Sequence, residues 1–236
     1  MSDSPKALFL FDIDGTLIST GKTARNIFIE IVRELTGKEV TLEVRQVAGF
    51  TDPKILENML QRAGLNDIEI PNAMEKFFPV YYERLEKEYH SAEDKILFSD
   101  ISESLPELYE VDNIYLGLVT GNMERSAMIK LSPFGLEKYF DLGAYASDEA
   151  DRNELPPIAV ARAETLWKKK FGMDEVFVVG DTIFDVECAL HNGFRAIGIA
   201  RNDGEKEMEQ LKNAGASWVY TSLPDVPQLK AIANLN

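Results

Sequence analysis

The sequence predicts an α/β fold in which a Rossmann-like parallel sheet forms the core and an all-helical cap domain is inserted into it. Three features support this prediction: short, continuously apolar runs, helical patterns between those runs, and a long helical region after the first run. Continuous apolar runs of this kind are typical of strands buried on both faces of a parallel sheet. Strands that alternate with helices indicate an α/β fold.

Each expected strand is a short apolar run followed by polar or glycine-containing sequence. The four clearest runs occupy residues 7–11, 114–119, 176–179 and 196–200, and a weaker one lies at 142–146. Helical patterns mark residues 126–131 and 156–171, and the second of these has prolines near its start and Gly172 just past its end. Proline in the first turn and glycine after the last turn are common helix boundaries.

Residues 20–97 form a helical region without a clear buried strand. Apolar residues recur there at helical spacing, and the aromatic ones are expected to be packed core. Within it, Gly49-Phe50-Thr51-Asp52 is the first candidate for a specificity loop, with a helix N-cap as the alternative interpretation. We therefore expect residues 1–19 and 98–236 to form the α/β core and residues 20–97 to form the helical cap.

The charge and composition exclude several classes of partner. The formal net charge is −15, which argues against a nucleic-acid partner because phosphate backbones recruit Lys and Arg. It is compatible with a small phosphorylated substrate, since a metal ion can supply local positive charge. Cys188 is the single cysteine, so no internal disulfide is expected. With no signal-peptide pattern and no apolar segment of the ~20 residues that span a bilayer, we expect a cytoplasmic protein without a membrane partner.

Two acids, Asp12 and Asp14, directly follow the first expected strand. Ligands of open α/β sheets bind at the carboxyl ends of the strands. Alternate side chains of an extended segment point the same way, and Gly15 then permits a sharp turn. One acid could therefore act as a nucleophile and the other as its acid–base partner, while a solvated Asp-Gly turn is the alternative.

A second pair of acids follows the expected strand at 176–179. Asp181 and Asp185 are separated by three residues, so they share a face if a helix begins there. Carboxylate oxygens are hard ligands that suit Mg²⁺. The alternative is that Asp181 only caps the helix.

The segment Thr120-Gly121-Asn122 follows the expected strand at 114–119. A hydroxyl and exposed backbone N–H groups can hold phosphate oxygens there, and a simple Gly-Asn turn is the alternative. Because parallel strands end on one edge, the three polar motifs predict a shared site. Phosphoryl transfer also requires positive charge, and Arg152, after the weak strand, is the candidate, although an Arg in an acidic run is usually solvated.

Together these motifs resemble the haloacid dehalogenase superfamily of phosphohydrolases. The resemblance extends roughly from Ala7 to Ala200 and is greatest to its phosphoglycolate phosphatase-like and β-phosphoglucomutase-like branch. Members of that branch carry a helical cap between the first and second motifs, which is where residues 20–97 lie. The resemblance thus implies the same core-and-cap architecture.

The resemblance also implies a catalytic role for each matching residue. Asp12 would attack phosphorus and become an aspartyl-phosphate, and Asp14 would protonate the leaving group and then activate water. Thr120 would hold the phosphoryl group, together with the backbone around Gly121 and Asn122. The implied reaction is the hydrolysis of small phosphate monoesters.

A Mg²⁺ ion is implied in the same way. Its ligands would be Asp12, the backbone carbonyl of Asp14, and Asp181, while Asp185 would support the metal shell or the basic residue. Arg152 would take the third-motif role, although the family more often has a lysine in a Lys-Pro context there.

Other functions remain open alternatives. A β-phosphoglucomutase-like phosphomutase would use the same core, but the segment after the first motif offers few groups to bind a phosphosugar beyond Lys22 and hydroxyls. A non-catalytic phosphate-binding module is disfavoured by the intact set of acids. A dehalogenase would not need Asp14, a phosphonatase would need a cap lysine that no motif selects, and Gly21-Lys22-Thr23 lacks the P-loop spacing.

Overall fold

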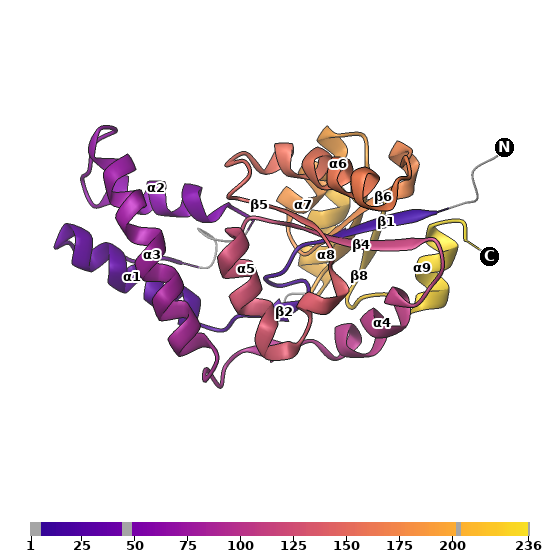
Figure 1. The fold of residues 1–236 in the computed structure, drawn as a ribbon, viewed down its shortest axis with the longest axis horizontal. Coiled ribbons are helices and arrows are strands. Elements are labelled where there is room, and N and C mark those ends of the chain that lie inside the picture. Colours follow the sequence, from indigo (N-terminus) through magenta and orange to yellow (C-terminus); the bar gives the residue numbers. More distant parts are fainter. Residues whose placement is uncertain (1–5, 44–48, 202–203, 236) are drawn as a thin grey trace.

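The structure, a computed structural model, describes residues 6–43, 49–201 and 204–235, which build a parallel sheet with helices on both faces (Figure 1). Six strands pair in the order β5-β4-β1-β6-β7-β8, and each pair is parallel. They are β1 (Ala7–Phe11), β4 (Ile114–Thr120), β5 (Gly143–Tyr145), β6 (Val176–Gly180), β7 (Arg195–Ile199) and β8 (Trp218–Tyr220). Because β1 pairs with β4 and β6, its carboxyl end lies between theirs.

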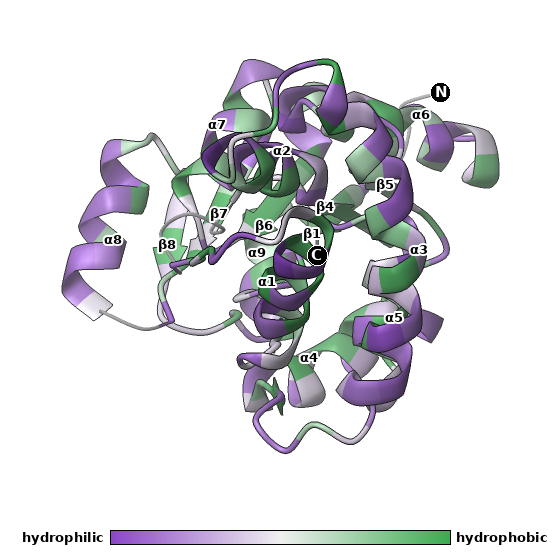
Figure 2. Cartoon of the chain, turned by 90° about the vertical axis from the view of Figure 1, so that its left-hand side faces the viewer, coloured by the Kyte–Doolittle hydropathy of each residue, from purple (hydrophilic) through white to green (hydrophobic). Residues whose placement is uncertain are grey.

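Helices cover both faces of the sheet. Those on one face are α4 (Ser99–Tyr109), α5 (Glu124–Leu131) and α9 (Val226–Ile232). Those on the other are α6 (Leu155–Trp167), α7 (Ile183–His191) and α8 (Gly204–Asn213). Phe9 and Phe11 of β1 belong to the first apolar layer, and Leu8 and Leu10 belong to the second. Figure 2 shows the result: β6 and β7 are mainly hydrophobic, whereas α8 at the margin is mostly hydrophilic.

Three further helices form a separate body beside the sheet, on the left in Figure 1. These are α1 (Thr23–Thr36), α2 (Asp52–Arg62) and α3 (Glu69–Tyr89). Their apolar sides make a cluster of their own, in which the ring of Phe28 lies 4.6 Å from those of both Phe77 and Tyr81. The aromatic residues of this region are therefore packed core, as the sequence analysis expected.

The two connections between the helical body and the sheet run side by side. They pair as a short antiparallel ribbon of β2 (Ile18–Ser19) and β3 (Ile96–Leu97). The sequence analysis did not expect this ribbon, because two-residue strands are too short to show alternation and Ile96 is exposed. The ribbon lies at the predicted limits of the cap, although those limits themselves stay a prediction.

The structure also corrects one helix and adds elements. The helix expected over residues 156–171 ends at Trp167, because Lys168 adopts the left-handed conformation, with φ of 54°, that terminates a helix. The sequence analysis did not predict α4, α8, α9 or β8. Residues 1–5, on which the expectation about a signal peptide rests, lie outside the described residues. Within the described part of the chain, no helix combines the length and apolar character needed to cross a membrane.

We expect Leu10→Ala to lower the free energy of unfolding by about 2–5 kcal/mol, because it leaves a cavity in a closely packed layer. Leu10 is fully buried, whereas Leu166 on α6 is 50% exposed. The matched change Leu166→Ala should therefore alter stability by no more than about 0.5 kcal/mol. Urea unfolding followed by circular dichroism measures both, and similar losses in the two variants would contradict the two-layer core.

Candidate active site

The polar motifs predicted from the sequence meet at one edge of the sheet, where the neighbouring strands β4, β1 and β6 end. They line a pocket of about 460 Å³ between the sheet and the helical body. The predicted site residues that line it are Asp12, Asp14, Thr120, Gly121, Asn122, Arg152 and Asp181. Asp185 is buried beside the pocket and contacts Arg152.

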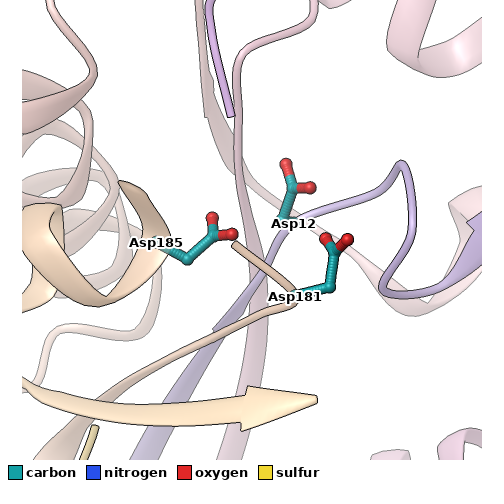
Figure 3. Close-up of side chains that lie close together, drawn as sticks. All are labelled: Asp12, Asp181 and Asp185. Atoms are coloured by element: carbon teal, nitrogen blue, oxygen red, sulfur yellow. The ribbon is translucent and has the colours of Figure 1, made fainter. Parts of the chain in front are cut away.

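Three carboxylates lie close together at this edge. Asp12 follows β1, Asp181 follows β6 and Asp185 lies in the first turn of α7, and each offers an oxygen within 4.8 Å of the others (Figure 3). Burial raises the pKa of Asp12 to about 7; Arg152 opposes this rise, and the charge of Asp185 adds to it. Burial also raises the pKa of Asp181 well above its ordinary value. Hard oxygen ligands crowded together away from water fit a divalent cation.

Arg152 is the positive charge beside this cluster. Its Nη2 atom lies 3.0 Å from Asp12 Oδ1 and 2.5 Å from Asp185 Oδ1, and its Nη1 donates to the carbonyl of Gly49 at 3.2 Å. Its side chain is only 9% exposed, so the solvated alternative is wrong. Although burial favours the neutral form, Asp185 and Asp12 hold the pKa of Arg152 above its ordinary value. This guanidinium therefore connects the acids to the helical body.

Asp14 lies outside the cluster and pairs with Lys130. The Nζ atom of Lys130 lies 2.8 Å from one carboxylate oxygen of Asp14 and 3.1 Å from the other. Asn122 donates its side-chain N–H to Asp14 at 2.6 Å, and Lys130 also donates to Asn122 Oδ1 at 2.5 Å. Burial acts to raise the pKa of Asp14, but the charge and hydrogen bonds of Lys130 outweigh it, so this pKa lies below its ordinary value. Asp14 is thus a fixed carboxylate on the pocket wall.

Gly15 lets the first motif approach the second. Its φ is +87°, and a Cβ atom at this position would lie 2.2 Å from Asp181 Oδ2. Any other side chain would therefore combine backbone strain with a direct clash. The hydroxyl of Thr16 then donates to Asp181 Oδ1 at 3.2 Å, so the turn also orients that acid.

Asp52, the first residue of α2, bonds both to Gly121 and to the start of α5. Its N–H donates to the carbonyl of Gly121 at 2.7 Å, and its Oδ2 accepts from the N–H of Met123 and the hydroxyl of Ser126, both at 3.0 Å. α5 has no capping side chain of its own, so the helical body caps this core helix. We refer to these three hydrogen bonds as the Asp52 clasp.

The loop that precedes Asp52 lies against the core. A Cβ atom at Gly121 would come within 2.5 Å of the carbonyl of Phe50, so glycine permits this approach. The ring of Phe50 packs 5.0 Å from that of Phe184, and the hydroxyl of Thr51 donates to the carbonyl of Ala150 at 3.0 Å. The candidate specificity loop thus borders the pocket, and Thr51 is also the N-cap residue of α2.

The second acidic motif differs in detail from the expectation. The N-cap of α7 is Thr182, not Asp181, and Asp185 accepts hydrogen bonds from the N–H and the hydroxyl of Thr182. α7 begins at Ile183, so the two acids do not share a face of one helix. They come together because Asp181 directly follows the last residue of β6, while Asp185 in the first turn of α7 points back toward the end of that strand.

Lys130 is the site residue that sequence reasoning missed, and the contacts of Asp52, which was named only as part of the loop at residues 49–52, were missed as well. The residues buried on α5 are Ser126, Ala127, Lys130 and Leu131. This spacing places a lysine on the buried side of an amphipathic helix, and that is the signal that could have identified it. Asp52 carried no such signal, because an acid in the first turn of a helix is ordinary.

Comparison with known proteins adds family information to this geometry. A family model described as haloacid dehalogenase-like hydrolase matches residues 9–199. A putative pyrophosphatase PpaX from Caldanaerobacter subterraneus subsp. tengcongensis is 30% identical over 190 residues, which cover 80% of this chain and 80% of that protein. A probable phosphatase IndB from Dickeya dadantii is 26% identical and covers 94% of this chain and 92% of its own length.

Solved structures are similar over nearly the whole chain. A predicted phosphatase from Clostridium acetobutylicum has a TM-score of 0.70 at 21% identity and covers 98% of this chain and 100% of that one. CbbY from Rhodobacter sphaeroides, solved in complex with phosphate, has a TM-score of 0.73 at 17% identity with the same coverage. At these identities the likeness shows the fold.

We expect Mg²⁺ to stabilise the protein, and to do so more at pH 8 than at pH 5.5. Burial raises the pKa of Asp12 from 3.8 to about 7, so the metal-free fold loses stability as pH rises through that window, where the carboxyl must ionise in place. A bound cation offsets this cost, whereas at low pH it must first displace protons. Thermal unfolding with Mg²⁺ or with chelator at each pH measures the difference.

The variant Asp181→Asn provides a second measurement for the same claim. It should abolish the Mg²⁺-dependent rise in unfolding temperature, because one ligand is lost. It should not lower the unfolding temperature of the metal-free protein, because a neutral amide replaces a carboxyl that is costly to ionise at this position. The matched change Asp174→Asn, at a 74% exposed side chain, should retain the full rise. Equal rises in wild type and Asp181→Asn would contradict a metal site at these acids.

Proposed function

We propose that this chain, which belongs to the haloacid dehalogenase-like hydrolase family, hydrolyses small phosphate monoesters through an aspartyl-phosphate on Asp12 and requires Mg²⁺. The observation that carries the proposal is the cluster of Asp12, Asp181 and Asp185 beside Arg152, at the floor of a pocket. Such a site can hold a phosphoryl group against a carboxylate while balancing its charge.

The residues present fit a magnesium ion. Asp12 provides a buried oxygen ligand and Asp181 a half-buried one, and the raised pKa values of both, caused first by desolvation, mark a place where added positive charge is favourable. We assign the ion to these two side chains and to the backbone carbonyl of Asp14, with Asp185 in support. When bound, Mg²⁺ would polarise the phosphoryl group and neutralise its charge.

The first chemical step is assigned to Asp12. One of its oxygens attacks phosphorus, a new P–O bond forms, and the bond from phosphorus to the alcohol oxygen breaks. Arg152, 3.0 Å from Asp12, and Thr120, whose hydroxyl also bonds to Asp12, orient the nucleophile. Backbone N–H groups near Gly121 and Asn122 would face the phosphoryl oxygens.

Asp14 is assigned the proton transfers. Its protonated form, which Lys130 disfavours in the unliganded site, gives a proton to the departing alcohol oxygen, and the resulting carboxylate then removes one from the water that hydrolyses the aspartyl-phosphate. Asp14 lines the same pocket as Asp12, and Lys130 and Asn122 fix its carboxylate in one orientation. In this proposal Asp12 is therefore the nucleophile and Asp14 is the acid–base group.

The helical body is proposed to act as a cap, with residues 20–97 as its extent. Its loop at residues 49–52 borders the pocket, and both of its connections pass through the β2–β3 ribbon. Contacts from Gly49, Thr51 and Asp52 to the core would form when the cap closes over a substrate. Closure would exclude bulk water from the aspartyl-phosphate.

The similar proteins support phosphate chemistry and differ in the substrate class that their names give. Among them are proteins named pyrophosphatase PpaX, a probable phosphatase and a putative β-phosphoglucomutase. All of these names refer to the transfer or hydrolysis of phosphoryl groups. We propose hydrolysis of organic monoesters for this chain because its pocket extends well beyond the phosphoryl site, along the apolar surface of the cap.

We expect Asp12→Asn to lower phosphate release from a panel of phosphorylated metabolites and pyrophosphate by at least roughly a thousandfold, because an amide is not a nucleophile here. The measurement is free phosphate with Mg²⁺ present. Asp112→Asn, at an exposed position, is the matched control and should retain wild-type rates. Near-normal turnover by a folded Asp12→Asn protein would exclude the covalent mechanism.

We expect Lys130→Met to slow the hydrolysis of alkyl phosphates by about a hundredfold, but to slow the hydrolysis of p-nitrophenyl phosphate by less than about tenfold. The alkyl alcohol needs a proton from a well-placed Asp14, whereas p-nitrophenolate leaves without one. The control is Lys212→Met on the exposed side of α8. A loss of similar size on both substrates would mean that Lys130 acts only on the fold, since a general structural defect does not distinguish leaving groups.

A further inference from the structure

The positive side chains around the pocket differ in one respect that bears on the substrate. Those that line it are Arg25, Lys130, Arg152 and Arg201. Lys130 pairs with Asp14, Arg152 pairs with Asp12 and Asp185, and Arg201 pairs with Asp100 at 2.8 Å. Within residues 6–43, 49–201 and 204–235, no ion pair or hydrogen bond involves the side chain of Arg25.

The position of Arg25 is not explained by the stability of its helix. It lies in the first turn of α1, and that turn contains no acidic residue. A cation near a helix N-terminus meets the positive end of the helix dipole. Its side chain is half-buried rather than fully solvated. A partly desolvated cation at this end of a helix is an unfavourable arrangement unless an anion binds there.

Apolar side chains of the helical body line the same pocket as Arg25. Phe28 lies one turn further along α1 on the same face, and Ile55 and Tyr81 line the same pocket from α2 and α3. The pocket volume of about 460 Å³ falls in the range that holds drug-sized ligands. A phosphoryl group occupies only the acidic end, so the rest of the space is available to the leaving group.

We propose that Arg25 binds a second anionic group on the leaving alcohol, so that the substrate is a phosphate monoester whose organic part has an apolar body and a carboxylate or second phosphate. This inference rests on the proposed phosphatase function and specifies its substrate class. The apolar side chains that line the pocket together with Arg25 and Asp12 account for the body, and the unpaired guanidinium accounts for the distal charge. Inorganic pyrophosphate has the two charges but no body to cover that surface.

The test measures the hydrolysis of four kinds of compound. They are phenyl phosphate, its 3-carboxy and 4-carboxy derivatives, benzyl phosphates with a second phosphate group on the ring, and pyrophosphate. In the wild type, the best ester with a second anionic group should exceed phenyl phosphate, which lacks one, in kcat/KM by roughly ten- to a hundredfold. This ratio corresponds to one hydrogen bond to a charged group. Arg25→Gln should bring that ratio to within about twofold of one. Arg25→Lys should restore part of it, because the charge is retained.

The control is Arg33→Gln, two turns along the same helix and exposed, which should keep the wild-type ratio. Hydrolysis of phenyl phosphate and the charged esters with equal efficiency, or an unchanged ratio in Arg25→Gln, would overturn the subsite while leaving the phosphatase proposal intact. Hydrolysis of none of the compounds would overturn both. Preference for pyrophosphate over every ester would overturn the claim that the substrate has an apolar body. The comparison of the carboxylated with the bisphosphorylated esters identifies which anion Arg25 binds.

Discussion

The arrangement of this site depends on keeping several buried carboxylates together at the end of a parallel sheet. Asp12, Asp181 and Asp185 approach to within 4.8 Å, and burial raises the pKa values of the first two. Like charges at this distance away from water repel strongly, so the fold must supply positive charge or bind it. Arg152 supplies one guanidinium, and a divalent cation would supply the remainder.

That electrostatic requirement explains why the neighbouring elements are built as they are. Gly15 allows the first motif to turn against Asp181, and Thr182 caps α7 so that Asp185 points back to Arg152. Asp14 is kept apart from the cluster by its own cation, Lys130. The two acids of the first motif thus have opposite pKa shifts although only Ile13 separates them, because burial outweighs Arg152 at Asp12, whereas the charge and hydrogen bonds of Lys130 outweigh burial at Asp14.

The same network connects the sheet to the helical body. Arg152 donates to the carbonyl of Gly49, and the Asp52 clasp caps α5, the helix that carries Lys130. A displacement of loop 49–52 would therefore remove a partner from both Arg152 and α5. The position of the helical body and the orientation of Arg152 and α5 therefore depend on one set of hydrogen bonds.

The sequence by itself determined the elements with strong local signals. The four apolar runs, the two acidic motifs and the start of α2 at Asp52 were predictable, because burial on both faces of a sheet demands continuous apolar residues and helix starts have characteristic residues. It also suggested Arg152, although only as one basic residue in an acidic run. Only the tertiary structure decided which carboxylates approach one another, that Arg152 is buried between two of them, and that Lys130 pairs with Asp14. Those pairings join residues far apart in the chain, so they arise from the packing of strands and helices and leave no periodic signal in the local sequence.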